Sequence, residues 1–321
     1  MLDTSSVSEQ SKNGTSVLPD WVDKFGSILR VVAFCFPSLA AKFMAMIWFK
    51  PFMPKPKQHV LDWQQSAQQK IDLKVGQAFL FYNNISSYEE QPLVVCVHGW
   101  RGRAHQMRRF IPVLLERGFR VLMVNLPAHS GQGKNYTHIY ECADVLKEIQ
   151  VQLGSIDSII AHSFGSPATI LALNEDFQIR KFTMVAPNLD IEYLLQEYAA
   201  AFGLQKLAPK IKQYIKQHCD KKIFLGSWEN LTLQTLQHNL KFVEEVEIWH
   251  DLLDTEISIE ANQTVFQFLF ERGRTAKIFE VQGLGHFQIL KDQDTVDRIC
   301  EELVKNVEGK KNPHYLHNVG K

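Results

Sequence analysis

The segment around Ser163 constrains the fold more than any other part of the sequence. An apolar run, Ser158 to Ala161, ends in His162-Ser163-Phe164-Gly165, and a helix-like pattern follows. Ser-x-Gly between a strand and a helix is typical of a nucleophile elbow, a tight and strained turn that exposes the serine hydroxyl above the end of a sheet. The full pattern has glycine two positions before the serine, where this chain has Ala161. The segment predicts Ser163 as a nucleophile, with an ordinary strand-to-helix turn as the alternative.

Other short apolar runs also end in turns with polar or glycine residues. They span residues 93–97, 120–125, 246–249 and 278–281. The turns that follow are His98-Gly99-Trp100-Arg101-Gly102, Leu126-Pro127-Ala128-His129, His250-Asp251-Leu252-Leu253-Asp254 and Gln282-Gly283-Leu284-Gly285-His286. Ligand and catalytic groups of an open α/β sheet lie at the carboxyl ends of its strands. We therefore expect these turns to meet Ser163 at one edge of a sheet.

A serine hydroxyl needs a base to become a nucleophile, and the base needs a carboxylate to orient it. We predict His286 as the base, because it follows a late strand in a glycine-rich loop. Asp254 is the predicted acid and Asp251 the alternative. The order serine, acid, histidine along the chain agrees with this assignment.

The same chemistry requires two hydrogen-bond donors for an oxyanion. We predict the backbone N–H groups of Phe164 and Trp100 for this role. His98, Gly99, His162 and Gly165 are expected to support the oxyanion loop and the elbow. His129 and His250 are expected to be structural histidines, their hydrogen bonds satisfied within the fold.

The motifs together resemble those of α/β-hydrolase-fold serine hydrolases. More closely, the chain is similar to bacterial α/β hydrolases of unsettled substrate that carry HGWxGR, PAH, HSxG, HDxxD and GLGH motifs. These motifs occur here as His98–Arg103, Pro127–His129, His162–Gly165, His250–Asp254 and Gly283–His286. The resemblance implies a mostly parallel sheet with helices on both faces and a helical lid. It also implies cleavage of a carboxylic ester or related acyl bond through an acyl-enzyme on Ser163. A catalytically silent scaffold that binds a ligand or partner, and an acyltransferase that uses the same triad, are the alternatives.

The strand and helix patterns divide the chain into successive segments. A hairpin around Gly76 precedes the core strands, and a helix is expected over residues 105–117. No strand pattern appears between residues 189 and 240, where apolar residues recur at helical spacing. The predicted segments are a polar tail (1–18), a helical extension and linker (19–65), a first core part (66–188), a helical lid (189–240), a second core part (241–308) and a C-terminal tail (309–321).

Composition excludes several classes of protein. The chain of 321 residues has 35 Lys and Arg against 35 Asp and Glu, so no basic excess favours nucleic acid as a partner. Its five cysteines show no spacing typical of zinc sites, and no phosphate-binding or dinucleotide-binding glycine motif is present. We expect no cofactor and no metal. The expected partner is a small, apolar acyl substrate, and the sequence does not indicate an oligomeric state.

Residues 28–49 form an apolar, aromatic-rich stretch. Arg30, Pro37 and Lys42 interrupt it, which disfavours a continuous membrane-spanning helix. We expect one or two helices packed on the hydrolase body of a cytoplasmic protein. Contact of residues 28–49 with a membrane surface from one side is the competing prediction.

Overall fold

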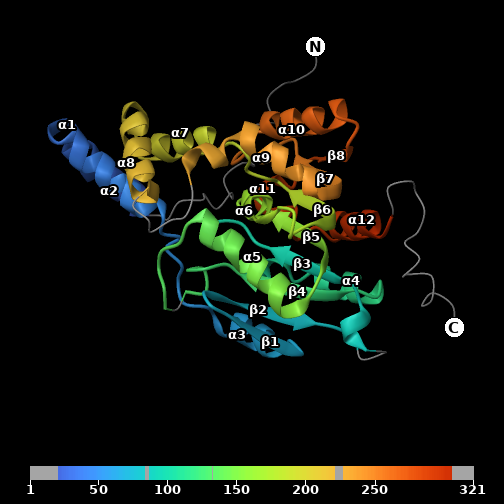
Figure 1. The fold of residues 1–321 in the computed structure, drawn as a ribbon. Helices are drawn as coiled ribbons and strands as arrows, with labels where there is room; N and C mark the ends of the chain where they lie inside the picture. Colours follow the sequence, from blue (N-terminus) through green and yellow to red (C-terminus); the bar gives the residue numbers. More distant parts are fainter. Residues whose placement is uncertain (1–20, 84–86, 132, 221–226, 306–321) are drawn as a thin grey trace, which may run out of the picture.

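A computed structural model describes residues 21–83, 87–131, 133–220 and 227–305. The two predicted terminal tails, 1–18 and 309–321, lie entirely outside these residues. The described chain is built around one eight-stranded sheet with the strand order β1-β2-β4-β3-β5-β6-β7-β8 (Figure 1). The strands are β1 (Gln69–Leu73), β2 (Gly76–Phe81), β3 (Leu93–Val97), β4 (Arg120–Asn125), β5 (Ile156–His162), β6 (Ile179–Val185), β7 (Val243–Asp251) and β8 (Thr275–Val281).

The sheet is mostly parallel, as the sequence predicts. Strands β4, β3, β5, β6, β7 and β8 pair in parallel, whereas β2 is antiparallel to both β1 and β4. The β1–β2 hairpin turns at Gly76, whose φ of +120° is strained for any residue with a side chain. Parallel pairing brings the ends of β3, β5, β7 and β8 to the same edge of the sheet, and the predicted functional turns follow these strands.

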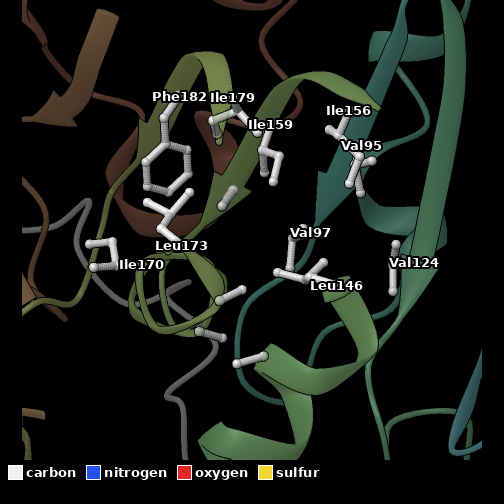
Figure 2. Packing of buried hydrophobic residues seen from close by; sticks show 14 of the residues in the cluster. Val95, Val97, Val124, Leu146, Ile156, Ile159, Ile170, Leu173, Ile179 and Phe182 are labelled. Carbon is white, nitrogen blue, oxygen red and sulfur yellow. The ribbon is translucent and has the colours of Figure 1, made fainter. Parts of the chain in front are cut away.

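Helices cover both faces of the sheet. They are α3 (Gln58–Gln65), α4 (Phe110–Glu116), α5 (Ile139–Leu153), α6 (Gly165–Ala172), α9 (Leu233–Asn239), α10 (Glu260–Glu271), α11 (Gly285–Gln288) and α12 (Gln293–Val304). On β3, Val95 and Val97 pack into one core with residues of α5 and α6, while Val94 and Cys96 pack into a second core with α4 and α12. Figure 2 shows the first of these cores, where Leu146 of α5 and Ile170 of α6 face the strands. This alternation is why β3 is apolar throughout: both of its faces are buried.

The expected helix over residues 105–117 is shorter than the apolar pattern suggests. Residues Ala104–Met107 form a 3₁₀ turn instead, and α4 begins only at Phe110. Pro112 accounts for this start, because it has no N–H to donate to a carbonyl one turn earlier. A proline is tolerated only in the first turn of a helix, where that donor would be unpaired in any case.

A separate layer of four helices combines the N-terminal extension with the segment that follows β6. It contains α1 (Trp21–Cys35), α2 (Pro37–Trp48), α7 (Ile191–Ala201) and α8 (Ala208–Asp220). Figure 1 shows α1 and α2 beside α8, at one end of the molecule. Their shared core includes Leu29 and Met44 from the first pair and Leu195 and Ile211 from the second pair. The helices of the N-terminal extension thus pack on helices that lie between β6 and β7 in the chain.

Candidate functional site

Ser163 lies at the turn between β5 and α6, in the conformation that the sequence pattern predicts. Its φ is +49°, in the left-handed region that non-glycine residues rarely occupy. The Ser163 N–H donates to the carbonyl of Val185 on the next strand, and the Ser163 carbonyl accepts from Ser166 N–H. The strained backbone is therefore held between the sheet and the first turn of the helix.

Gly165 explains why the elbow needs glycine after the serine. A Cβ on Gly165 would lie 2.8 Å from the carbonyl oxygens of both Val97 and His98. These are backbone atoms at the end of β3, so they cannot move aside as a flexible side chain could. The helix can pass this close to the strand only with a hydrogen atom at that position.

His286 and Asp254 come together from the turns after β8 and β7. The Nδ1 of His286 lies 2.8 Å from Oδ2 of Asp254, whose side chain is fully buried. The other oxygen, Oδ1, accepts from the N–H groups of Glu256 and Ile257 at 2.8 and 3.0 Å. Burial opposes ionisation of Asp254. The hydrogen bonds from His286 and from the two amides outweigh that effect and lower the pKa of the carboxyl. The carboxylate is thus ionised at neutral pH and fixes the proton of His286 on Nδ1.

Asp251 has a different environment from Asp254. Its Oδ1 accepts from Leu253 N–H at 2.7 Å, and its Oδ2 accepts from Leu284 N–H at 2.6 Å. Asp251 therefore ties the turn after β7 to the loop that carries His286. It makes no hydrogen bond to the imidazole itself among the described residues.

His162 and His98 brace the strand ends around the serine. The Nε2–H of His162 donates to the carbonyl of His286 at 2.9 Å, which links the elbow to the histidine loop. His98 accepts from Leu126 N–H at Nε2, and its Nδ1–H donates to the carbonyl of Gly99. Burial lowers the pKa of His162 to about 3 and that of His98 well below its ordinary value, so both rings are neutral. Gly99 packs closely against His162, since a Cβ at that position would lie 2.9 Å from Nδ1 of His162.

Two further histidines hold neighbouring turns. His129 donates from Nδ1 to the carbonyl of Pro127 at 2.7 Å, and burial lowers its pKa to about 4. His250 donates from Nε2 to the carbonyl of Ile257 and accepts at Nδ1 from Asn262. Asn262 is a buried supporting residue that sequence reasoning missed. It lies on α10, and no motif marked it.

Trp100 and Phe164 line the same cavity as Ser163. A turn closed by the Gly102 N–H and the Gly99 carbonyl carries Trp100, and Phe164 directly follows the serine. Neither amide donates to a protein acceptor among the described residues. The indole of Trp100 packs edge-on against the ring of Phe164, with ring centroids 5.0 Å apart.

A cavity of about 370 Å³ opens over the serine. Its lining includes Ser163, His286, Trp100 and Phe164. Among the described residues no hydrogen bond joins the Ser163 hydroxyl to His286. Part of the remaining wall is apolar and comes from the helical layer, including Ile47 and Trp48 of α2 as well as Ile191 and Leu194 of α7. The contribution of α2 is a second feature that the sequence pattern did not indicate, since it depends on how distant helices pack.

The described residues contain no group of three or more His, Cys, Asp and Glu side chains that could hold a metal ion. No helix in this part of the chain is both long and apolar enough to cross a bilayer.

Comparison with known proteins agrees with the architecture. The family model described as the alpha/beta hydrolase fold matches residues 92–235. An esterase of Pyrococcus furiosus superposes with a TM-score of 0.55 at 15% identity, over 78% of this chain and 97% of that one. Est1E of Butyrivibrio proteoclasticus gives 0.53 at 15% identity, over 74% and 99%. A monoacylglycerol lipase of Paleococcus ferrophilus gives 0.51 at 19% identity, over 73% and 99%.

A search of curated proteins finds no significant match to the sequence. At the identities of the solved structures, the likeness is one of fold. The chain therefore has the α/β-hydrolase fold that its motifs indicated.

Proposed function

We propose that this α/β-hydrolase-fold protein is a serine hydrolase that cleaves a carboxylic ester through an acyl-enzyme on Ser163. The observation that carries the proposal is the hydrogen bond, 2.8 Å long, between His286 and the buried Asp254 carboxylate, beside a cavity that His286 shares with Ser163. The strained backbone of Ser163 and the esterase and lipase among the similar structures support it.

In the proposed mechanism, Asp254 keeps the proton of neutral His286 on Nδ1, so that Nε2 carries the lone pair. His286 Nε2 takes the proton of the Ser163 hydroxyl as the oxygen attacks the ester carbonyl carbon. The hydrogen bond between these two groups forms with substrate, as catalytic hydrogen bonds often tighten only in the complex. Asp254 stabilises the imidazolium that results.

The negative charge that develops on the carbonyl oxygen is stabilised by the N–H groups of Phe164 and Trp100. The tetrahedral intermediate collapses, the alcohol leaves with the proton from His286, and the acyl group stays on Ser163. Water then attacks the acyl-enzyme in the same manner and releases the carboxylic acid. Removal of one oxyanion donor costs roughly 3 kcal/mol of transition-state stabilisation in studied enzymes.

Turnover of p-nitrophenyl butyrate by the purified protein tests the proposal. Ser163→Ala should abolish turnover. Ser166→Ala is the matched control, because Ser166 is also buried and its hydroxyl donates only to the carbonyl of Ala161, at 3.3 Å. Equal activity of the Ser163→Ala and wild-type proteins would contradict the assignment. A rate of product release that rises with added alcohol, with the ester of that alcohol as product, would instead favour acyl transfer.

A further inference from the structure

Helices α1 and α2 present an apolar face to solvent. Phe34 is 89% exposed, Val31 67% and Leu39 59%. Ile28, Phe36 and Met46 are also more than half exposed. Apolar residues scattered singly on a surface are ordinary, but these follow one another along two packed helices. We call the set Ile28, Val31, Phe34, Phe36, Leu39 and Met46 the α1–α2 patch.

Within residues 26–57, the segment that contains the α1–α2 patch, all charged residues are basic. The segment 26–57 contains no Asp or Glu, and its charged residues are Arg30, Lys42, Lys50, Lys55 and Lys57. The whole chain has a formal net charge of +0, so this excess of positive charge is local. Of these residues, Lys42 lies on α2 between Leu39 and Met46, one helical turn from each, within the patch itself. Apolar side chains interspersed with basic ones fit a surface that is both apolar and anionic.

The opposite side of α2 contributes to the cavity over Ser163. Ile47, Trp48 and Phe49 line that cavity, and Tyr198 of α7 donates its hydroxyl proton to the carbonyl of Met44 at 2.8 Å. A single helix thus separates the α1–α2 patch from the apolar wall of the cavity. Within the described part of the chain, α1 has 15 residues and α2 has 12, fewer than the roughly 20 that a membrane-spanning helix needs.

We propose that α1 and α2 dock into the interface of an anionic lipid bilayer through the α1–α2 patch, and that the cavity beneath takes the acyl chain of a lipid ester from that bilayer. The first statement, the docking part, depends only on the surface of α1 and α2. The second statement, the acyl part, rests on the proposed function. Lys42 contacts anionic headgroups, and the patch enters the apolar layer below them. Ile47 and Trp48, on the side of α2 that faces away from this layer, then form part of the wall of the cavity that takes the acyl chain.

Vesicle sedimentation tests the docking without any need for catalysis. Ser163→Ala protein, which leaves lipid intact, is mixed with phosphatidylcholine vesicles that contain or lack phosphatidylserine. The patch variant combines Val31→Gln, Phe34→Gln, Leu39→Gln and Met46→Gln. The matched control combines Val151→Gln and Phe270→Gln, which are 86% and 65% exposed on α5 and α10.

We expect binding to the anionic vesicles, weakened at least about tenfold in the patch variant and unchanged in the control. Lys42→Gln should weaken binding by about fivefold, and high salt should weaken it as well. A patch variant that binds as tightly as the wild-type protein overturns the docking. A patch that instead holds a dimer in vesicle-free solution, with monomers in the patch variant, overturns it too, because a second copy then covers this face.

Hydrolysis separates the two parts of the proposal. Wild-type protein and the patch variant should turn over a water-soluble ester at the same rate, while release of fatty acid from vesicle-borne ester falls with the loss of binding. Binding without any turnover of either ester overturns the acyl part and the proposed function, and leaves the docking standing. Turnover of the soluble ester with none from vesicles overturns the acyl part alone.

Discussion

Replacement of Asp254 by Asn changes one heavy atom of the Asp254–His286 pair. We expect it to leave His286 in a tautomer that cannot act as the base. Oδ1 of Asp254 accepts from the N–H groups of Glu256 and Ile257, so the amide oxygen of Asn must take that position. The opposite orientation would lose both of these hydrogen bonds, at about 1 kcal/mol or more each. The amide NH₂ therefore faces Nδ1 of His286. The imidazole must then accept at Nδ1 and carry its proton on Nε2, where it cannot receive the proton of Ser163.

The expected loss in kcat is roughly 10³- to 10⁴-fold, as for a triad histidine in the wrong tautomer. This corresponds to about 4 to 5.5 kcal/mol in the activation barrier. The fold should be nearly unaffected, because the volume and the hydrogen bonds of the side chain are kept.

Asp251→Asn is the matched control. Both oxygens of Asp251 accept from backbone N–H groups, those of Leu253 and Leu284. After the substitution, one of these two N–H groups must face the NH₂ group of Asn and loses its acceptor. We expect a loss of about 1 to 3 kcal/mol in the free energy of unfolding. The loss in kcat should stay below about tenfold, because His286 keeps its tautomer.

The assay is kcat and KM for p-nitrophenyl butyrate, with urea denaturation of each variant beside it. Asp254→Asn should lose activity and keep stability, and Asp251→Asn should lose stability and keep most of its activity. A larger loss of kcat in folded Asp251→Asn than in Asp254→Asn would refute the reasoning from hydrogen-bond partners.

Other expectations follow from the same geometry. Gly165→Ala should lower the free energy of unfolding by about 1 to 3 kcal/mol in urea denaturation, because its Cβ meets two backbone carbonyls at 2.8 Å, and an unchanged midpoint would contradict this. The folded pKa values of His98, His129 and His162 lie below the ordinary value of about 6.5, so the unfolded chain binds protons that the folded chain does not. The contribution of these histidines to the free energy of unfolding is therefore fully present above about pH 6.5. It falls as the pH is lowered toward 4, by up to about 1.4 kcal/mol per pH unit for each histidine. His129→Phe should make that slope shallower, and an equal slope would count against the neutral imidazole. Medium-length p-nitrophenyl esters should exceed the acetyl ester in kcat/KM, by up to about 0.8 kcal/mol per buried methylene, and a flat series would indicate a small or polar substrate.

The sheet could be predicted because its determinants are local. Apolar runs that end in polar or glycine turns identify β3, β5, β7 and β8, and parallel pairing places their ends together. The predicted helix over residues 105–117 began too early. Apolar periodicity does not reveal that Pro112 must lie in the first turn of the helix. Helix α10 was not predicted, although Val265 and Leu269 lie one turn apart on its buried side.

Only part of the candidate site could be predicted from the sequence. Motifs identify Ser163, Asp254 and His286 as candidates, but the choice between the two aspartates depends on which backbone amides each one meets. Asn262 and the wall contributed by α2 depend on contacts between distant segments, which no spacing within the chain encodes. The sequence indicated that residues 28–49 were unusually apolar. It did not indicate that one side of α2 lines a cavity and the other faces solvent.

Covalent labelling at Ser163 tests the central claim most directly. The purified protein is treated with a fluorophosphonate probe, digested and analysed by mass spectrometry for the modified residue. We predict one probe per chain, on Ser163, with labelling lost in Ser163→Ala and strongly slowed in His286→Ala. Ser166→Ala should label like the wild-type protein. A folded wild-type protein that takes up no probe, or takes it up at another residue, would contradict the account.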